Sequence, residues 1–201
     1  MRASYVFVCS ATVAIAAPVL MAVFGIGAPA APQFGFFNGQ SSTISDPAGD
    51  ASAVLQRQNV SATPEVRGYH DLLSASVSRQ GERFALELEV AGDPNLNEKY
   101  ETVYMWHMVS AEDRYYVVMF VNFAPGFHDS QGWHYAIFDR TENQYVVPLT
   151  AIGQMPADRV AYSIDADLIG NPASFRYWVS VYSRVEPTFD DWPEYLMDYA
   201  P

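Results

Sequence analysis

The clearest alternation of apolar and polar residues in the chain lies in Asp71–Val90, DLLSASVSRQGERFALELEV. Alternation with a period of two places one row of side chains in a core and the other row in water. Gly81 supplies the positive φ that a short hairpin loop needs. The stretch therefore predicts a β-hairpin. The expected inward positions are Leu73, Ala75, Val77, Phe84, Leu86, Leu88 and Val90.

Other short apolar or alternating runs follow the hairpin, and turn residues separate them. These runs are Thr102–Ser110, Tyr115–Phe123, Trp133–Phe138, Gln144–Leu149, Asp158–Ile164 and Ser174–Ser183. The run Thr102–Ser110 is apolar on both faces, which predicts a central strand. The segment Asp165–Gly170 predicts one helical turn that Gly170 closes. Since no long helix is indicated, we expect an all-β fold: an antiparallel β-sandwich, jelly-roll or immunoglobulin-like, of about eight or nine strands.

The N-terminal segment, residues 1–31, has the pattern of a targeting signal. Arg2 precedes an apolar run, Tyr5–Ile26, and Ala28–Ala30 offers small residues at a cleavage site. The run is longer than the core of about 7–15 residues found in signal peptides, and it approaches the ~20 residues that span a bilayer. We therefore expect a signal peptide or an uncleaved N-terminal anchor. In both cases the domain is secreted or otherwise extracytoplasmic.

Composition changes along the rest of the chain and predicts its division. The segment 32–68, rich in Gly, Ser, Ala, Gln and Pro, predicts a linker and an irregular lead-in. The β-sandwich domain is expected over 69–185. The last segment, 186–201, predicts a C-terminal tail because its apolar residues follow no clear period.

The formal net charge of −12 and the single lysine, Lys99, restrict the possible partners. Nucleic acid and anionic lipid need clustered Lys and Arg, so we expect no nucleic-acid partner and no membrane contact beyond the signal or anchor. The only cysteine, Cys9, lies in the targeting segment, so the sandwich is expected to have no disulfide. An acidic surface suits divalent cations or neutral ligands.

Several motifs appear in an order that resembles a known group of domains. An Asp-Pro-x-Gly-Asp turn, Asp46–Asp50, precedes the hairpin, and the strings VAYSIDADLIGNP and FRYWVSVYS follow it. Over roughly residues 43–185, this order resembles the exported β-sandwich domains related to carbohydrate-binding module family 9 and to the DOMON superfamily. The resemblance implies a mostly non-enzymatic ligand-binding domain. Some members of that group bind sugars, some bind haem, and many hold a structural calcium near the opening acidic turn.

Calcium is the cofactor that the acidic turn and the resemblance favour. Calcium takes six to eight oxygen ligands from carboxylates, backbone carbonyls and water. Asp46 and Asp50 match the acidic turn of the group, and Asp71 matches the acidic start of the first hairpin strand. Asp190 and Asp191 are possible additional ligands. Alternatively, Asp46 and Asp50 only stabilise a turn through bonds to nearby N–H groups.

Carbohydrate is the ligand class that the aromatic residues favour. Sugar sites need exposed aromatic platforms beside polar side chains, and Trp133 and Trp192 are the tryptophans expected to be exposed. His128 and His134 belong to the loop string FHDSQGWH, where contacts to a ligand are expected. With Asp129 they could instead hold zinc or copper.

Haem is the alternative ligand, and it would require specific axial ligands. His107 and Met105 lie two residues apart on one predicted strand, and both residue types are axial ligands of haem iron. The second ligand would have to come from another strand. A histidine on an apolar strand is more often an ordinary core residue.

No enzyme motif is present. The sequence lacks G-x-S-x-G and H-E-x-x-H, and Glu87 and Glu89 fit the wet face of a strand. We therefore expect a non-catalytic domain that binds carbohydrate or a cell-surface polymer, with a structural calcium. A haem-binding electron-transfer domain and a purely structural surface protein are the alternatives.

Overall fold

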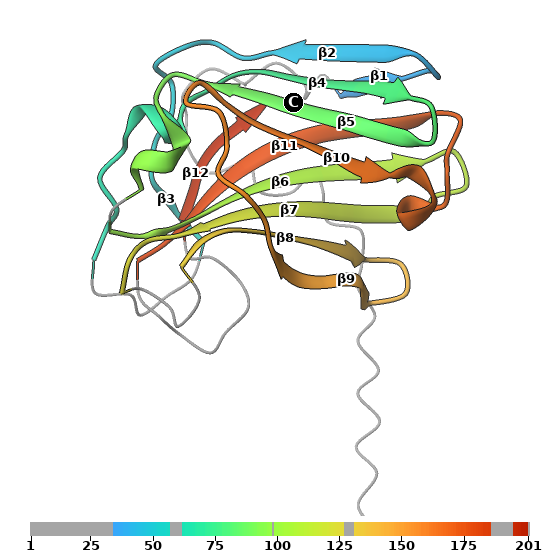
Figure 1. The fold of residues 1–201 in the computed structure, drawn as a ribbon. Coiled ribbons are helices and arrows are strands. Elements are labelled where there is room, and N and C mark those ends of the chain that lie inside the picture. The colour runs from blue at the N-terminus through green and yellow to red at the C-terminus, as the bar shows by residue number, and fades with distance from the viewer. Residues whose placement is uncertain (1–33, 57–61, 98, 127–130, 186–194, 201) are drawn as a thin grey trace, which may run out of the picture. The chain divides into compact units, whose positions relative to one another are not determined.

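Two antiparallel sheets form the part of the computed structural model that is described, residues 34–56, 62–97, 99–126, 131–185 and 195–200 (Figure 1). All these residues belong to one unit, Gln33–Pro201. The prediction of an all-β antiparallel sandwich is confirmed. The predicted signal or anchor, 1–31, lies outside the described residues.

The larger sheet has eight strands among the described residues, in the order β3-β12-β11-β6-β7-β8-β9, with β1 also paired to β11. Its strands are β1 (Gly35–Phe37), β3 (Val54–Leu55), β6 (Glu101–Ser110), β7 (Tyr115–Phe123), β8 (Gly132–Asp139), β9 (Gln144–Ala151), β11 (Phe175–Arg184) and β12 (Tyr195–Ala200). The described part of the smaller sheet has the order β10-β5-β4-β2. Its strands are β2 (Ser41–Ser45), β4 (Leu72–Gln80), β5 (Arg83–Val90) and β10 (Arg159–Asp165).

Helical structure in the described residues is limited to three short 3-10 turns. They are η1 (Gly68–His70), η2 (Pro94–Leu96) and η3 (Ala166–Ile169). Gly170 ends η3 at a φ of 77°, in the left-handed region, as the sequence predicts for a helical turn closed by glycine. In the described part of the chain, no helix has both the length and the apolar character needed to cross a membrane.

The main core lies between the two sheets. It joins alternate residues of β6, β7 and β11 to the inward row of the β4–β5 hairpin. Trp106 is fully buried in it, and its ring lies 5.5 Å from that of Tyr177 on the neighbouring strand β11. Burial of such large apolar surfaces is the main favourable term for folding.

Strands β6 and β7 carry a second apolar cluster on their other face. Val103, Met105 and Val117 are buried there, apart from the main core. This explains why Thr102–Ser110 shows no alternation in the sequence: both faces of a central strand are covered.

The hairpin that the alternation predicts is confirmed as β4 and β5, with Gly81 at a φ of 64° in the turn. One inward position differs from the expectation. The pairing register shifts between Leu72 and Ser74, so Leu72 is fully buried whereas Leu73 is only half-buried. A bulge adds one residue to a strand and moves its neighbours to the other face.

The expectations for 32–68 and 186–201 are wrong where the structure describes these segments. Strand β2, in the predicted lead-in, pairs with β4, and β12, in the predicted tail, pairs with β11. The sandwich therefore extends beyond the predicted bounds 69–185 at both ends. This extension matters for function because the candidate site uses both added strands.

Candidate metal centre

Three carboxylates from the two ends of the described chain converge at the edge of the sandwich. Asp46 directly follows β2, Asp50 lies four residues later, and Asp198 lies on β12. One carboxylate oxygen from each of the three lies within 4.8 Å of the others. The backbone N–H of Asp46 donates to the carbonyl of Leu73 over 2.9 Å, which fixes the entry to the turn against β4.

Asp71 supports this site from beside it. Both of its carboxylate oxygens accept the backbone N–H of Gly49, each at 2.9 Å. Gly49 has a φ of 84°, a conformation that favours glycine. Asp71 therefore holds the turn between Asp46 and Asp50 in shape, and it adds negative charge nearby.

Asp198 is held rigidly by the backbone. Its Oδ2 accepts the N–H of Leu72 at 2.7 Å, and its Oδ1 accepts the N–H of Tyr199 at 2.8 Å. Strand β12 in turn is positioned by its pairing with β11. The carboxylate thus faces Asp46 and Asp50 from a fixed strand.

The electrostatics of the cluster are unfavourable for three ionised carboxylates. Burial, together with the charges of Asp198, Asp50 and Asp71, raises the pKa of Asp46 to about 7. Burial also raises the pKa of Asp198 to about 6, although its two backbone hydrogen bonds oppose the shift. Asp46 Oδ2 is buried and accepts no hydrogen bond from a residue that the structure describes. Among the described residues, no Lys or Arg forms an ion pair with any of the three.

The donor set fits a hard cation. Carboxylate oxygens suit calcium or magnesium, whereas zinc and copper prefer nitrogen or sulfur ligands. A divalent cation would supply the positive charge that the described side chains around Asp46 do not provide. The residues of this site therefore fit the calcium that the sequence predicts, with Asp198 as a third ligand.

Of the predicted ligands, the structure brings Asp46 and Asp50 together, whereas Asp71 lies beside them with both carboxylate oxygens on the N–H of Gly49. The sequence did not indicate Asp198, the third carboxylate of the cluster. The sequence near Asp198 offers one local sign of a strand, the alternation of Tyr195 and Met197 with other residues. Both side chains are buried in the structure. Asp190 and Asp191, the other suggested ligands, lie outside the described residues.

The expectation that Trp133 is exposed is wrong. Its side chain is 4% exposed, because β8 directs it into the core, where it stacks on Tyr104 with ring centroids 5.9 Å apart. Its indole N–H donates to Asn95 Oδ1 over 2.9 Å. A tryptophan that is buried and bonded in this way cannot serve as a sugar platform. Trp192 lies outside the described residues.

His134 also differs from the expectation of a loop residue. It is buried on β8, with its ring edge-on to Phe123 at 5.2 Å and its Nδ1 atom 3.2 Å from the carbonyl of Gly132. It therefore offers no exposed ligand contact. His128 and Asp129, its expected partners in a zinc or copper site, lie outside the described residues.

His107, the candidate haem ligand, already uses both ring nitrogens. Nδ1 is 2.8 Å from the hydroxyl of Tyr115, and Nε2 is 2.9 Å from the hydroxyl of Ser180. The ring stacks flat on Trp178 at 4.8 Å. Iron ligation would break one of these hydrogen bonds, so the geometry opposes the haem alternative.

Glu87 and Glu89 are exposed, as expected for the outer row of β5. Glu89 accepts a hydrogen bond from Ser74, and Arg159 lies 3.9 Å from Glu87. These contacts are those of a solvated strand face.

No family model matches the chain, and neither a curated protein nor a solved structure matches it. The likeness to carbohydrate-binding and DOMON-type domains therefore remains a prediction from the sequence pattern.

Proposed function

We propose that the chain is a non-catalytic ligand-binding β-sandwich domain that holds calcium at Asp46, Asp50 and Asp198. The observation that carries this proposal is the approach of the three carboxylates to within 4.8 Å of one another. Calcium fits better than magnesium, because it accepts irregular sets of carboxylate and backbone oxygens, whereas magnesium demands near-ideal octahedral geometry.

The site lies where the two sheets meet, which indicates a structural role for the cation. Asp46 directly follows β2 of the smaller sheet, and Asp198 belongs to β12 of the larger sheet. A bound cation would offset the repulsion between these carboxylates and tie the two sheets together. Asp71 would keep the turn at Gly49 in the conformation that presents Asp46 and Asp50.

Carbohydrate or a cell-surface polymer is the ligand class that we propose. The resemblance to family 9-like domains supports it, and so does the acidic composition, which disfavours polyanionic nucleic acid. Since Trp133 is buried, the ligand site must use other residues.

Thermal unfolding with and without calcium tests the metal site. A cation that binds only the folded state adds about 2.7 kcal/mol at a hundredfold excess over its dissociation constant. We therefore expect the melting temperature to fall in chelator and to recover with calcium more than with magnesium. Asp50→Asn should abolish the response. The exposed Asp167→Asn on η3 is the matched control and should keep it.

An unchanged melting temperature in chelator would rule out the calcium site. The ligand class needs its own measurement, a glycan panel followed by intrinsic fluorescence or calorimetry. A panel without a single binding sugar would exclude carbohydrate while leaving the calcium result intact.

A further inference from the structure

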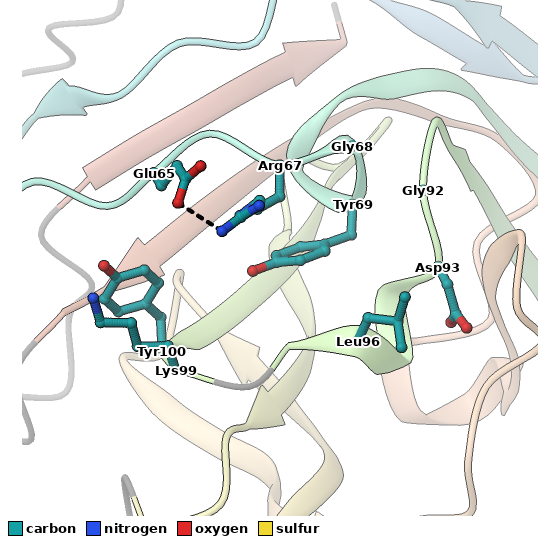
Figure 2. A pocket seen from close by; sticks show the side chains of 9 residues that line it. All are labelled: Glu65, Arg67, Gly68, Tyr69, Gly92, Asp93, Leu96, Lys99 and Tyr100. Carbon is teal, nitrogen blue, oxygen red and sulfur yellow. Dashed lines mark hydrogen bonds and ion pairs between the residues drawn. The ribbon is translucent and has the colours of Figure 1, made fainter.

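A cavity of about 450 Å³ lies between the segment that enters β4 and the connection from β5 to β6. Its volume falls within the roughly 300–1,000 Å³ of small-molecule sites. Figure 2 shows Glu65, Arg67 and Tyr69 along one side, with Leu96 and Lys99 on the other. None of these residues was singled out as a ligand contact from the sequence.

Close backbone packing builds the back of this cavity. A Cβ atom at Gly92 would lie 2.9 Å from the backbone nitrogen of Tyr69, so only glycine permits this approach. The carbonyl of Tyr69 accepts the buried hydroxyl of Tyr104 at 2.7 Å. These contacts fix the backbone of η1 against Gly92, so the wall that carries Tyr69 is rigid before any ligand arrives.

The charged side chains that line the cavity differ in whether they already have a bonding partner among the described residues. Arg67 is bound to Glu65 at 2.6 Å, and Asp93 Oδ1 accepts both the N–H and the side-chain amide of Asn95. Lys99, in contrast, forms no ion pair with a described residue. Its ammonium lies 5.1 Å from the ring centroid of Tyr100. The only lysine of a chain with net charge −12 thus lines the cavity, and its charge is unmatched by a described carboxylate.

The apolar part of the lining is also positioned for a ligand. Leu96 is 61% exposed although it is a large aliphatic residue, and it lines the cavity with Tyr69 and Tyr100. Aromatic and aliphatic surfaces suit the C–H face of a sugar ring, whereas charged groups such as the Arg67–Glu65 pair can bond its hydroxyls.

We propose that this cavity binds a sugar acid, a polyhydroxylated ring bearing one carboxylate, with the carboxylate at Lys99. The inference rests on the carbohydrate part of the proposed function and adds a site and a charge class to it. It is independent of the calcium site. The lysine selects the anion, the Arg67–Glu65 pair bonds ring hydroxyls, and Leu96 packs against the ring.

Calorimetry of the purified protein at low salt, with calcium present, tests the proposal. The probes are D-glucuronate and D-galacturonate, with D-glucose and D-galactose as neutral counterparts and acetate as a bare carboxylate. We expect the uronates to bind, and the neutral sugars to bind at least about tenfold more weakly because the charge-assisted contact at Lys99 is lost. Acetate should also bind more weakly than the uronates, because it has no ring to pack on Leu96. Added salt should weaken the binding of the uronates.

Lys99→Gln should weaken uronate binding at least about tenfold, and Leu96→Ser should weaken it as well. Both side chains are exposed, so the variants should fold normally. Arg176→Gln is the matched control, because it removes the same charge from β11, outside this cavity, and should bind uronate unchanged.

The proposal is overturned if Lys99→Gln binds uronate as well as the wild type, or if neutral sugars bind as tightly as uronates. In the first case the uronate carboxylate does not bind at Lys99, and in the second the cavity does not select an anion. Carbohydrate binding as such stands in both cases. If neither sugar type binds, this inference and the carbohydrate part of the proposed function both fail.

Discussion

The backbone N–H of Leu72 donates to Asp198 Oδ2 over 2.7 Å, across 126 residues of sequence. The bond fastens the last described strand of the larger sheet to the first residue of β4 in the smaller sheet. The same carboxylate faces Asp46 and Asp50. The side chain of Asp198 therefore links the two sheets and also contributes to the proposed calcium site.

Asp198→Ala should destabilise the protein even without calcium. The substitution leaves the N–H groups of Leu72 and Tyr199 without their acceptor, which costs about 1–3 kcal/mol for a buried group. Asp198→Asn keeps one acceptor oxygen and should cost less. Urea denaturation in chelator measures both, with the exposed Asp167→Ala as the control, expected within about 0.5 kcal/mol of the wild type.

If Asp198→Ala were as stable as the wild type in chelator, the bond to Leu72 would contribute nothing to the fold. Both Asp198 variants should also lose the response to calcium. A normal calcium response in Asp198→Asn would remove this residue from the metal site.

Because the pKa of Asp46 is raised, the difference in stability between Asp46→Asn and the wild type should depend on pH. The pKa is about 7 in the folded protein and about 3.9 in the unfolded chain. The folded state therefore binds more protons between these values, and the wild type loses stability as the pH rises through that window. Asparagine does not titrate.

In chelator, Asp46→Asn should match the wild type near pH 4 and become the more stable of the two by pH 7.5. With calcium at pH 7.5 the order should reverse, because a charged carboxylate binds the cation more strongly than the neutral amide of asparagine. Urea midpoints at the two pH values provide the measurement. A wild type that gains stability over the variant as the pH rises in chelator would contradict the raised pKa.

The strands that the sequence predicts well are those whose pattern is local. The hairpin Leu72–Val90 alternates because one face is wet, and Glu101–Ser110 is continuously apolar because both faces are covered. Strand β2, Ser41–Ser45, has only one apolar residue, Ile44, since its pairing with β4 leaves it at the edge of the smaller sheet. Its strand character comes from tertiary pairing, which no local pattern displays.

The sequence could predict only the part of the candidate metal site whose residues are close together in the chain. Asp46 and Asp50 share one turn, so their proximity follows from the sequence. Asp198 joins them through strand pairing at long range, and the aromatic residues around it show no clear period. The predicted exposure of Trp133 is wrong for a related reason. The residue follows a polar loop, but the pairing of β8 with β7 turns its side chain inward onto Tyr104.

Gly35→Ala tests whether β1 packs against the sandwich as the structure has it. A Cβ atom at Gly35 would lie 2.5 Å from the ring of the buried Tyr177 and 2.9 Å from Ile44. Such overpacking costs about 1–3 kcal/mol. Gly153→Ala is the control, because a Cβ atom there meets nothing within 4 Å. Equal unfolding free energies for the two variants would mean that β1 does not pack on Tyr177.

His107 should remain neutral throughout the physiological range. Burial, with a smaller effect of Arg140, lowers its pKa to about 3, and both ring nitrogens are bonded to hydroxyls. The unfolded chain takes up this proton near pH 6.5. The contribution of His107 to stability is therefore complete above that pH and decreases as the pH falls toward 3.

Proton NMR of the imidazole gives the direct measurement. The His107 resonance should not shift between pH 8 and pH 5, whereas the histidines of the urea-unfolded protein should titrate near pH 6.5. His107→Phe preserves stacking on Trp178 but removes the hydrogen bonds of the imidazole to the hydroxyls of Tyr115 and Ser180, at a cost of about 1–3 kcal/mol. A titration midpoint near 6, or a Soret band on haem addition that His107→Phe abolishes, would show that the imidazole is free to bind a proton or iron.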